Sequence, residues 1–256
     1  MAAVAHQRHI GNCGTPESTW QMWLQSGTIK GCKLPDLLPV NTRLVVVAPH
    51  PDDEVLACGG LMAMHQAQGG EVVVVSVSDG EASHGICLQW QSAALAAKRH
   101  HELLQGLHRL GLQQTAVHRL ALPDGAIAAH AAKLESALMA LLKPLDVVVT
   151  TWRLDGHPDH EATAKATARA CAKLGCRLME APVWMWHWAK VNDPFVPWQQ
   201  LRGLALVSDI VQKKMAALAA HVSQLEVAIH PVGAVLDAAI VARVGRAHEY
   251  YFCAGR

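Results

Sequence analysis

Residues 43–54 read RLVVVAPHPDDE. The first half is a short β-branched run, which is typical of a strand buried on both faces of a sheet. The second half places a histidine and three consecutive acids directly after that strand. Repulsion among Asp52, Asp53 and Glu54 costs energy unless a bound cation offsets it or the acids point in different directions. The stretch therefore predicts the first strand of a sheet, followed by a turn suited to a cation.

Strand-like and helix-like segments alternate after this stretch. Three more apolar runs predict strands, at 71–78, 115–122 and 146–152. Segments with helical apolar spacing separate or follow them, at 54–70, 88–111, 127–143 and 161–175. Two further strands and one last helix are expected at 177–184, 201–208 and 211–225.

This order predicts an α/β fold, with a doubly wound, mostly parallel sheet covered by helices on both faces. No fixed-period repeat or convincing linker occurs, so we expect a single domain over residues 43–256. Residues 1–42 precede the alternating pattern and hold a short helix signal at Thr15 and Pro16. We expect them to form an N-terminal extension packed on the core.

Composition narrows the function classes. The chain has 256 residues, 51% hydrophobic and 17% charged, with a formal net charge of +1. This balance, without a long basic run, gives no support for binding nucleic acid or membrane surfaces. No apolar run reaches about 18 residues, so we expect no membrane span. The seven cysteines form no C-x-x-C pair and the N-terminus lacks a signal-peptide core, so we expect a reducing, cytoplasmic setting.

A second polar cluster follows the fourth predicted strand. The string RLDGHPDHEA, residues 153–162, carries Asp155, His157, Asp159 and His160. In a doubly wound sheet, strands one and four are neighbours where the strand order reverses, and ligands bind outside their carboxyl ends. Acids at a helix start are also favoured by the helix dipole alone. Two such clusters at one predicted edge nevertheless favour a functional crevice.

The residue types at this edge suit a metal ion. The first turn has acids where a dinucleotide site needs glycines, which disfavours a nucleotide-binding oxidoreductase as the alternative. His50 and Asp53 with either His160 or His157 form a two-histidine, one-carboxylate set, which suits Zn²⁺ and also Fe²⁺. Asp52 is then free to take a proton from the metal's water, and the remaining histidine to face the oxyanion or protonate the leaving group.

These motifs resemble those of a known family. PHPDDE (49–54) together with HPDH (157–160) is similar to the PIG-L/LmbE family of zinc-dependent deacetylases, which remove the acetyl group from N-acetylglucosaminyl conjugates. The resemblance spans about residues 43–252. It includes four weaker pieces in the expected order, which are SDGE (78–81), Arg99 with Glu102, LPDG (122–125) and KMAALAAHVSQ (214–224).

The resemblance implies a Rossmann-like fold and a division of roles. His50, Asp53 and His160 are implied as the ligands of Zn²⁺, or of Fe²⁺. Asp52 is implied as the general base. His157 is implied as the group that stabilises the tetrahedral intermediate or protonates the departing amine.

Four further positions receive supporting roles from the same resemblance. Asp159 is expected to orient its histidine neighbours. Arg99 and Asp124 are expected to hold sugar hydroxyls, although Arg99 could instead lie on a solvated helix face. Glu81 is expected to line the pocket or to cap a loop.

We therefore expect a metal-dependent amidohydrolase that acts on a small-molecule N-acetylated sugar conjugate. A homo-oligomer of this chain is a further candidate assembly. Within this class, the substrate could instead be a thiol-linked or antibiotic-linked glucosaminide. From other classes, the alternatives are a Rossmann-type nucleotide-binding oxidoreductase and a non-catalytic sugar-binding protein. The latter should lack Asp52 or a ligand, and the sequence lacks none of them.

Two remaining features have competing interpretations. In PVWMWHWAK (182–190), Trp184, Trp186 and Trp188 would share one face of an extended segment, either as a stacking wall for a sugar or as a buried strand face. We favour the buried face. His221 could approach the site, but helix packing is the favoured role.

Overall fold

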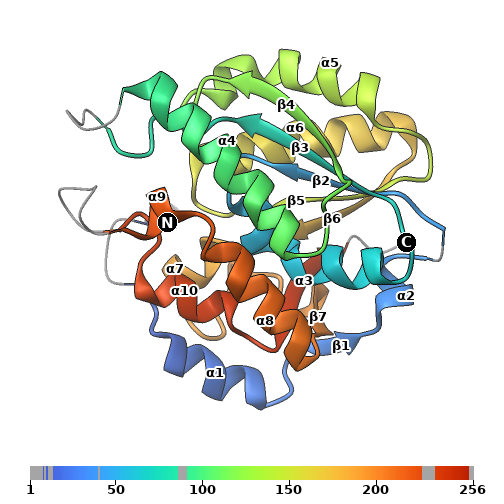
Figure 1. Ribbon diagram of the computed structural model, residues 1–256. Coiled ribbons are helices and arrows are strands. Elements are labelled where there is room, and N and C mark those ends of the chain that lie inside the picture. Colours follow the sequence, from blue (N-terminus) through green and yellow to red (C-terminus); the bar gives the residue numbers. More distant parts are fainter. Residues whose placement is uncertain are drawn as a thin grey trace, which may run out of the picture.

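The computed structural model describes residues 8, 10, 14–39, 41–85, 91–226 and 234–253. Within them, eight strands form one sheet in the order β1-β7-β8-β6-β5-β2-β3-β4 (Figure 1). The strands are β1 (Lys30–Cys32), β2 (Leu44–Ala48), β3 (Val72–Ser78), β4 (Ala116–Leu122), β5 (Val147–Thr151), β6 (Arg177–Ala181), β7 (Leu201–Ala205) and β8 (His248–Cys253).

Helices connect these strands and cover the sheet. They are α1 (Glu17–Gln25), α2 (Leu34–Leu37), α3 (Asp53–Ala67), α4 (Ser92–Arg109), η1 (Ile127–His130), α5 (Ala131–Leu141), α6 (Pro158–Leu174), α7 (Met185–Trp188), η2 (Trp198–Gln200), α8 (Ser208–Leu218), α9 (Val222–Leu225) and α10 (Ala238–Val244). None of these helices is long and apolar enough to cross a membrane.

The predicted doubly wound sheet is confirmed. The four strands β2, β3, β4 and β5 are mutually parallel where they pair. The first strand, β2, lies between β3 and β5, with Val47 opposite Val75 on one side and Thr150 on the other. The strand order thus reverses at β2, so the loops after β2 and β5 emerge side by side, as the sequence predicted.

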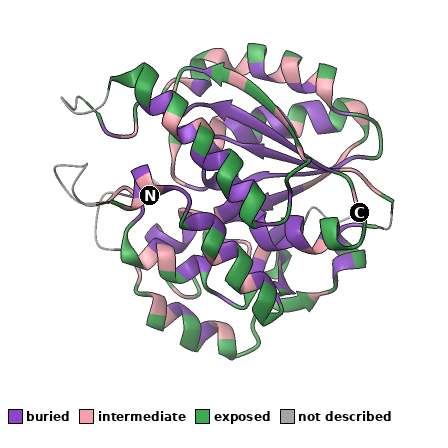
Figure 2. Ribbon diagram, viewed as in Figure 1, coloured by how far each residue is buried: buried purple, intermediate pink, exposed green. Residues whose placement is uncertain are grey.

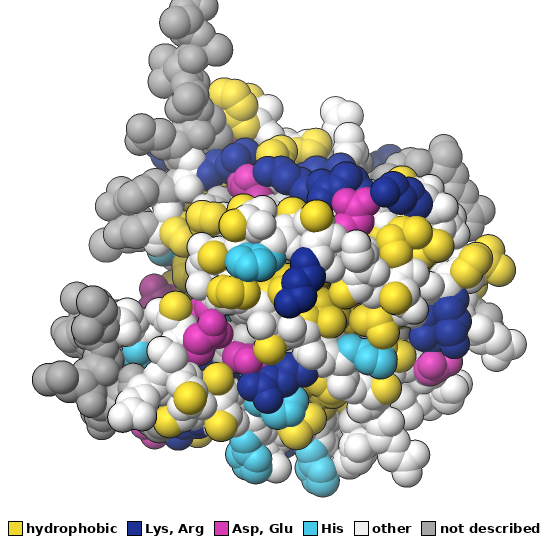
Figure 3. Space-filling view, turned by 90° about the horizontal axis from the view of Figure 1, so that it is seen from above, with side chains coloured by type: hydrophobic (Ala, Val, Ile, Leu, Met, Phe, Trp, Pro, Cys, Tyr) yellow, Lys and Arg dark blue, Asp and Glu magenta, His cyan; other side chains and the backbone are white. Residues whose placement is uncertain are grey.

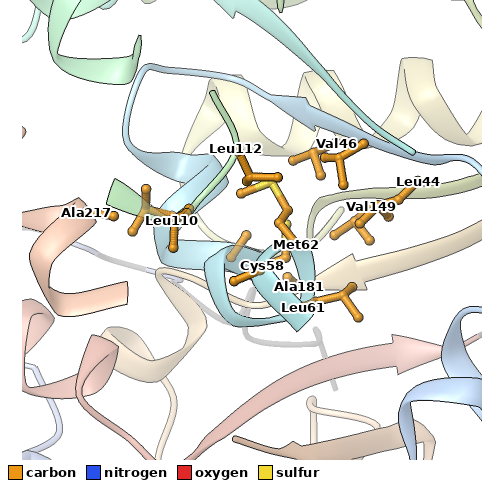
Figure 4. Packing of buried hydrophobic residues seen from close by; sticks show 14 of the residues in the cluster. Leu44, Val46, Cys58, Leu61, Met62, Leu110, Leu112, Val149, Ala181 and Ala217 are labelled. Atoms are coloured by element: carbon orange, nitrogen blue, oxygen red, sulfur yellow. The ribbon is translucent and has the colours of Figure 1, made fainter. Parts of the chain in front are cut away.

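The side chains of β2 point alternately into two apolar clusters, which explains why this strand lies at the centre of the sheet. Leu44 and Val46 lie in the apolar cluster that includes α3 and α8 residues (Figure 4), whereas Val45 and Val47 lie in the cluster with α5 and α6. Every residue of β2, β3 and β5 is buried, and Figure 2 shows the central strands buried throughout. A strand that is buried on both faces of a sheet needs apolar side chains at every position, and a continuous β-branched run provides them.

Two strands were not predicted from the sequence. β8 is inserted between β6 and β7 and runs antiparallel to both. β1 belongs to the first 42 residues and pairs in parallel with β7 at the sheet edge. The described part of the N-terminal segment also includes α1, whose Trp20 is fully buried and donates from Nε1 to the carbonyl of Trp186 at 2.7 Å.

The tryptophan tract does not continue the strand as predicted. β6 ends at Ala181 and α7 begins at Met185, so the three tryptophans do not alternate along an extended chain. The cause is Asp155, whose carboxylate accepts hydrogen bonds from the backbone N–H groups of residues 183, 184 and 185. Trp186 packs in the core against Trp20, whereas Trp188 donates to the Asp155 carbonyl.

The last predicted helix, 211–225, is also interrupted. It is two helices, α8 and α9, which break at Ala219–His221. Glu102 from α4 accepts hydrogen bonds from both the backbone N–H and the hydroxyl of Ser223, at 2.9 and 2.6 Å. This carboxylate restarts the helix in a new direction, and the break brings His221 into the interior.

Candidate metal-dependent active site

The two polar clusters meet at the carboxyl edge of β2 and β5. His50 and Asp52 lie in the turn between β2 and α3, and Asp53 is the first residue of α3. His157 caps α6, and His160 lies in the first turn of that helix. Asp52 has a backbone φ of +138°, which is strained for a residue with a side chain. Backbone strain of this kind persists where the surrounding structure enforces it, which is common at functional sites.

Three side chains form a cluster of metal-ligand type. His50 Nδ1 lies 3.1 Å and His160 Nε2 lies 3.2 Å from the same oxygen, Oδ2 of Asp53. All three residues are buried, and the ligand atoms lie within 4.8 Å of one another. His160 Nδ1 contacts Asp155 Oδ2 at 2.7 Å, and a carboxylate on the far ring nitrogen is typical of metal-bound histidine.

The charges around this cluster favour a cation. His50 Nε2 lies 3.1 Å from Asp124 Oδ1 and 3.3 Å from Asp159 Oδ2. Burial lowers the pKa of His50, but hydrogen bonds with these two acids and Asp53 outweigh it and hold the pKa well above its usual value. Burial also lowers the pKa of His160, yet Asp53 and Asp155 raise it to about 9. The site thus attracts positive charge, which protons or a divalent metal can supply.

The alternative histidine, His157, differs in its surroundings. Its Nδ1 accepts a hydrogen bond from the backbone N–H of Asp159 at 3.2 Å. Burial lowers its pKa to about 3, with further lowering by His160 and His50. His157 is therefore neutral, with its proton on Nε2. A set of His50, His157 and Asp159 also lies within 4.8 Å, but His160 has the carboxylate partner.

Asp52 is buried beside the ligand cluster and is held by an arginine. Arg99 Nη2 contacts Asp52 Oδ2 at 3.1 Å and the Pro51 carbonyl at 2.8 Å, while Nη1 donates to the Gly80 carbonyl at 2.9 Å. Burial raises the pKa of Asp52 to about 7; Arg99 opposes this and Asp53 adds to it. A carboxylate poised near neutral pH suits a general base.

Arg99 does not lie on a solvated helix face, because it is only 2% exposed. The loop that receives it requires glycine: Gly80 has a φ of +66°, and a Cβ there would overlap the Arg99 guanidinium. Arg99 also lines the cavity, so a sugar hydroxyl remains within its reach. The guanidinium charge of Arg99 lies against the turn that contains Pro51 and Asp52.

The other expected residues join loops around the site. Asp124 Oδ2 accepts from the Ala82 N–H at 2.9 Å, and Glu81 accepts from the Asp124 N–H at 3.0 Å. The Asp159 carboxylate accepts from the N–H groups of Gly125 and Ile127 and contacts the His50 ring, rather than the rings of its neighbours His157 and His160.

A cavity of about 320 Å³ opens onto these groups. Its polar lining residues include Asp52, His157, Arg99, Asp124 and Ser83. Its apolar lining residues include Leu56, Trp184 and Leu236. Such a mixture of apolar walls and converging polar groups is typical of a small-molecule site.

Comparison with known proteins agrees with this geometry. The family model for PIG-L, described as GlcNAc-PI de-N-acetylase, matches residues 45–171. The chain belongs to the PIG-L family.

Relatives of this PIG-L protein are deacetylases. A 1D-myo-inositol 2-acetamido-2-deoxy-alpha-D-glucopyranoside deacetylase from Mycobacterium sp. (strain KMS) is 27% identical, with 88% of each chain aligned. Two solved structures share the fold. Teicoplanin deacetylase Orf2 in a zinc-inhibited form has a TM-score of 0.62 and 19% identity, covering 82% of this chain and 97% of that one. N,N'-diacetylchitobiose deacetylase from Pyrococcus horikoshii has a TM-score of 0.56 and 20% identity, covering 86% and 83%.

The comparisons do not support the nucleotide-binding oxidoreductase alternative. Figure 3 shows one face of this PIG-L protein, on which Asp and Glu side chains lie among the Lys and Arg side chains. Elsewhere among the ion pairs of the described residues, Glu135 pairs with Arg169 and Lys173, and Glu161 pairs with Lys165.

Sequence reasoning missed several supporting residues of the PIG-L site. Asp155 was part of the second cluster, but nothing in its spacing showed that it both holds His160 and starts α7. Glu54 lies in the first turn of α3, where the helix dipole alone would favour an acid. It is fully buried, accepts from the Asp52 N–H at 3.0 Å, and lies 3.6 Å from Nε2 of the buried His221. The AHVSQ motif was the only signal for this second contact.

Proposed function

We propose that this PIG-L family member is a metal-dependent amidohydrolase that removes the N-acetyl group of an N-acetylglucosamine-type conjugate. The observation that carries the proposal is the buried Asp52, held by Arg99, beside the cluster of His50, Asp53 and His160 on one cavity. The named relatives, which act on an acetamido sugar of inositol, on teicoplanin and on diacetylchitobiose, support this substrate class.

The metal would be held by His50, Asp53 and His160. When bound, a divalent ion supplies a Lewis acid that lowers the pKa of water to ~7 and polarises a carbonyl. Two imidazoles and one carboxylate suit both Zn²⁺ and Fe²⁺. We propose Zn²⁺ first, because the motifs at residues 49–54 and 157–160 resemble those of a zinc-dependent family.

The residues of the chain itself account for the proton movements. Asp52 takes a proton from the attacking water as the water oxygen forms its bond to the acetyl carbon. His157, neutral with its proton on Nε2, donates a hydrogen bond to the developing oxyanion. When the carbon–nitrogen bond breaks, protonated Asp52 can return the proton to the departing amine. The products are acetate and a free amine.

The lining residues of the cavity indicate how the rest of the substrate would bind. We propose that Asp124 and Arg99 hold sugar hydroxyls, since both line the cavity. Glu81 does not line it and supports Asp124 from behind, through the backbone of that residue. Trp184 is the only tryptophan among the described lining residues, so it is the candidate for stacking on the sugar ring.

The test is acetate release from a panel of N-acetylated sugar conjugates, including thiol-linked and antibiotic-linked glucosaminides, with and without a chelator. Activity should vanish with the chelator and return with Zn²⁺ or Fe²⁺. Asp52→Asn should be nearly inactive, and Asp209→Asn, at an exposed carboxylate of α8, should match the wild type. Chelator-resistant acetate release, or full activity in Asp52→Asn, would contradict the proposal.

A further inference from the structure

A second, smaller cavity lies next to the one described above. Its volume is about 40 Å³, and Leu56 of α3 lines both cavities. A cavity needs roughly 10–15 Å³ to hold one water, so this one admits a small ligand. Four of its lining residues are basic or potentially basic: Lys214, Arg243, Arg246 and the exposed His248.

Two of these basic side chains are neutralised by partners. Lys214 Nζ lies 2.6 Å from Glu249 Oε1, and both side chains are buried. Arg246 makes a two-pronged contact with Glu17, at 2.8 and 2.6 Å, and its guanidinium lies 4.3 Å from the centre of the Trp186 ring. Neither pair leaves a net charge facing the cavity.

Among the described residues, Arg243 has no such partner. It is 8% exposed, and its Nε, Nη1 and Nη2 are all buried without a hydrogen-bond partner in the described structure. Burial lowers its pKa to about 10, with further lowering by Arg246 and an opposing contribution from Asp237. The Asp237 carboxylate caps the start of the same helix, through the Ile240 N–H. A buried guanidinium is costly unless an anion satisfies it.

We propose that this cavity binds a short carboxylate anion, such as acetate, through the guanidinium of Arg243. The planar fork of arginine matches the two oxygens of a carboxylate. Among the described lining residues, Arg243 is a guanidinium without a counter-ion, and one negative charge would balance it. The inference stands without the proposed reaction, although acetate would be a product of that reaction.

The test compares thermal unfolding of the wild type and Arg243→Met in sodium HEPES and in sodium acetate at equal ionic strength. In HEPES, Arg243→Met should melt at or above the wild-type temperature, because a buried unpaired charge is removed. Acetate should raise the melting temperature of the wild type and leave Arg243→Met unchanged. Acetate bound at the metal site would act on both proteins alike. Arg169→Met, at an exposed arginine of α6, should respond as the wild type does.

Three results would overturn the assignment. The first is an equal acetate effect in the wild type and Arg243→Met, and the second is no acetate effect on the wild type. The third is an equal effect of chloride, which lacks the two oxygens. If Arg243→Met does not fold, calorimetric titration of acetate into the wild type and Arg243→Lys decides. Arg243→Lys keeps the charge but not the fork, so it should bind acetate about tenfold more weakly. Equal binding by both proteins would contradict the proposal.

Discussion

Replacement of Arg99 by methionine tests how the site activates Asp52. The substitution removes the contact of 3.1 Å to Asp52 Oδ2 and the two hydrogen bonds to the carbonyls of Pro51 and Gly80. An opposite charge at this range lowers a carboxyl pKa by about 1–3 units. Because Arg99 lowers the pKa of Asp52, its loss should raise that pKa and keep the base protonated to higher pH.

The assay is the pH profile of kcat/KM for acetate release. The acid limb should move to higher pH by about 1–3 units, which is a tenfold to thousandfold loss at a pH on that limb. Metal content should stay unchanged, because Arg99 contacts none of the three ligand candidates in the hydrogen bonds given above. Arg109→Met, at the exposed end of the same helix, is the matched control.

The outcome separates two roles of Arg99. A shifted acid limb identifies it as the residue that positions and tunes Asp52. A raised KM with an unmoved limb would refute this reasoning and leave the sugar-hydroxyl role alone. Arg99→Lys should restore part of the shift, since a charge returns without the planar fork.

Three other substitutions test the remaining parts of the site. Asp52→Asn should keep metal and slow turnover by roughly 10²–10⁴, the usual contribution of a general base, as metal analysis with single-turnover kinetics can show. Asp155→Asn should weaken metal binding by roughly 10–100-fold, because it holds His160; competition with a chelator measures this, and unchanged affinity would contradict it. Burial raises the pKa of Glu54 to about 8, so Glu54→Gln should keep wild-type stability at pH 7 in chemical denaturation. A loss of more than about 2 kcal/mol there would show that Glu54 is ionised and paired.

The sequence predicted where the site lies better than it predicted the contacts that hold the surrounding segments in place. The β-branched runs of β2 and β5 are local signals, and parallel topology then forces the loops after them together. The antiparallel β8 had no such signal. HEYYFC is short, and its place between β6 and β7 depends on pairing with residues 43 to 74 positions earlier in the chain.

Two of these contacts were not predicted, because each involves a carboxylate that is far away in the sequence. Asp155 turns residues 183–185 out of the strand direction, from about 30 positions away. Glu102 restarts the chain at Ser223, across 121 positions. Local spacing at 182–190 and 211–225 remains compatible with a strand and a helix, so a window of sequence does not reveal either interruption.

The charge conflict in PHPDDE is resolved differently from the simplest reading of its sequence. Glu54 has its pKa raised to about 8 by burial, so at neutral pH it is protonated and adds no repulsion. Asp52 is opposed by Arg99, and Asp53 lies between His50 and His160. The turn by itself therefore has little excess negative charge.

The demand for a cation instead comes from acids outside the turn. Asp124 and Asp159 contact the far nitrogen of the His50 ring, and Asp155 contacts that of His160. Asp124 and Asp155 belong to the loops after β4 and β5, and Asp159 belongs to the first turn of α6, so the excess charge exists only once the sheet has formed. Metal binding should accordingly stabilise the folded chain rather than the isolated turn, because the unfolded chain does not assemble those acids around the two histidines.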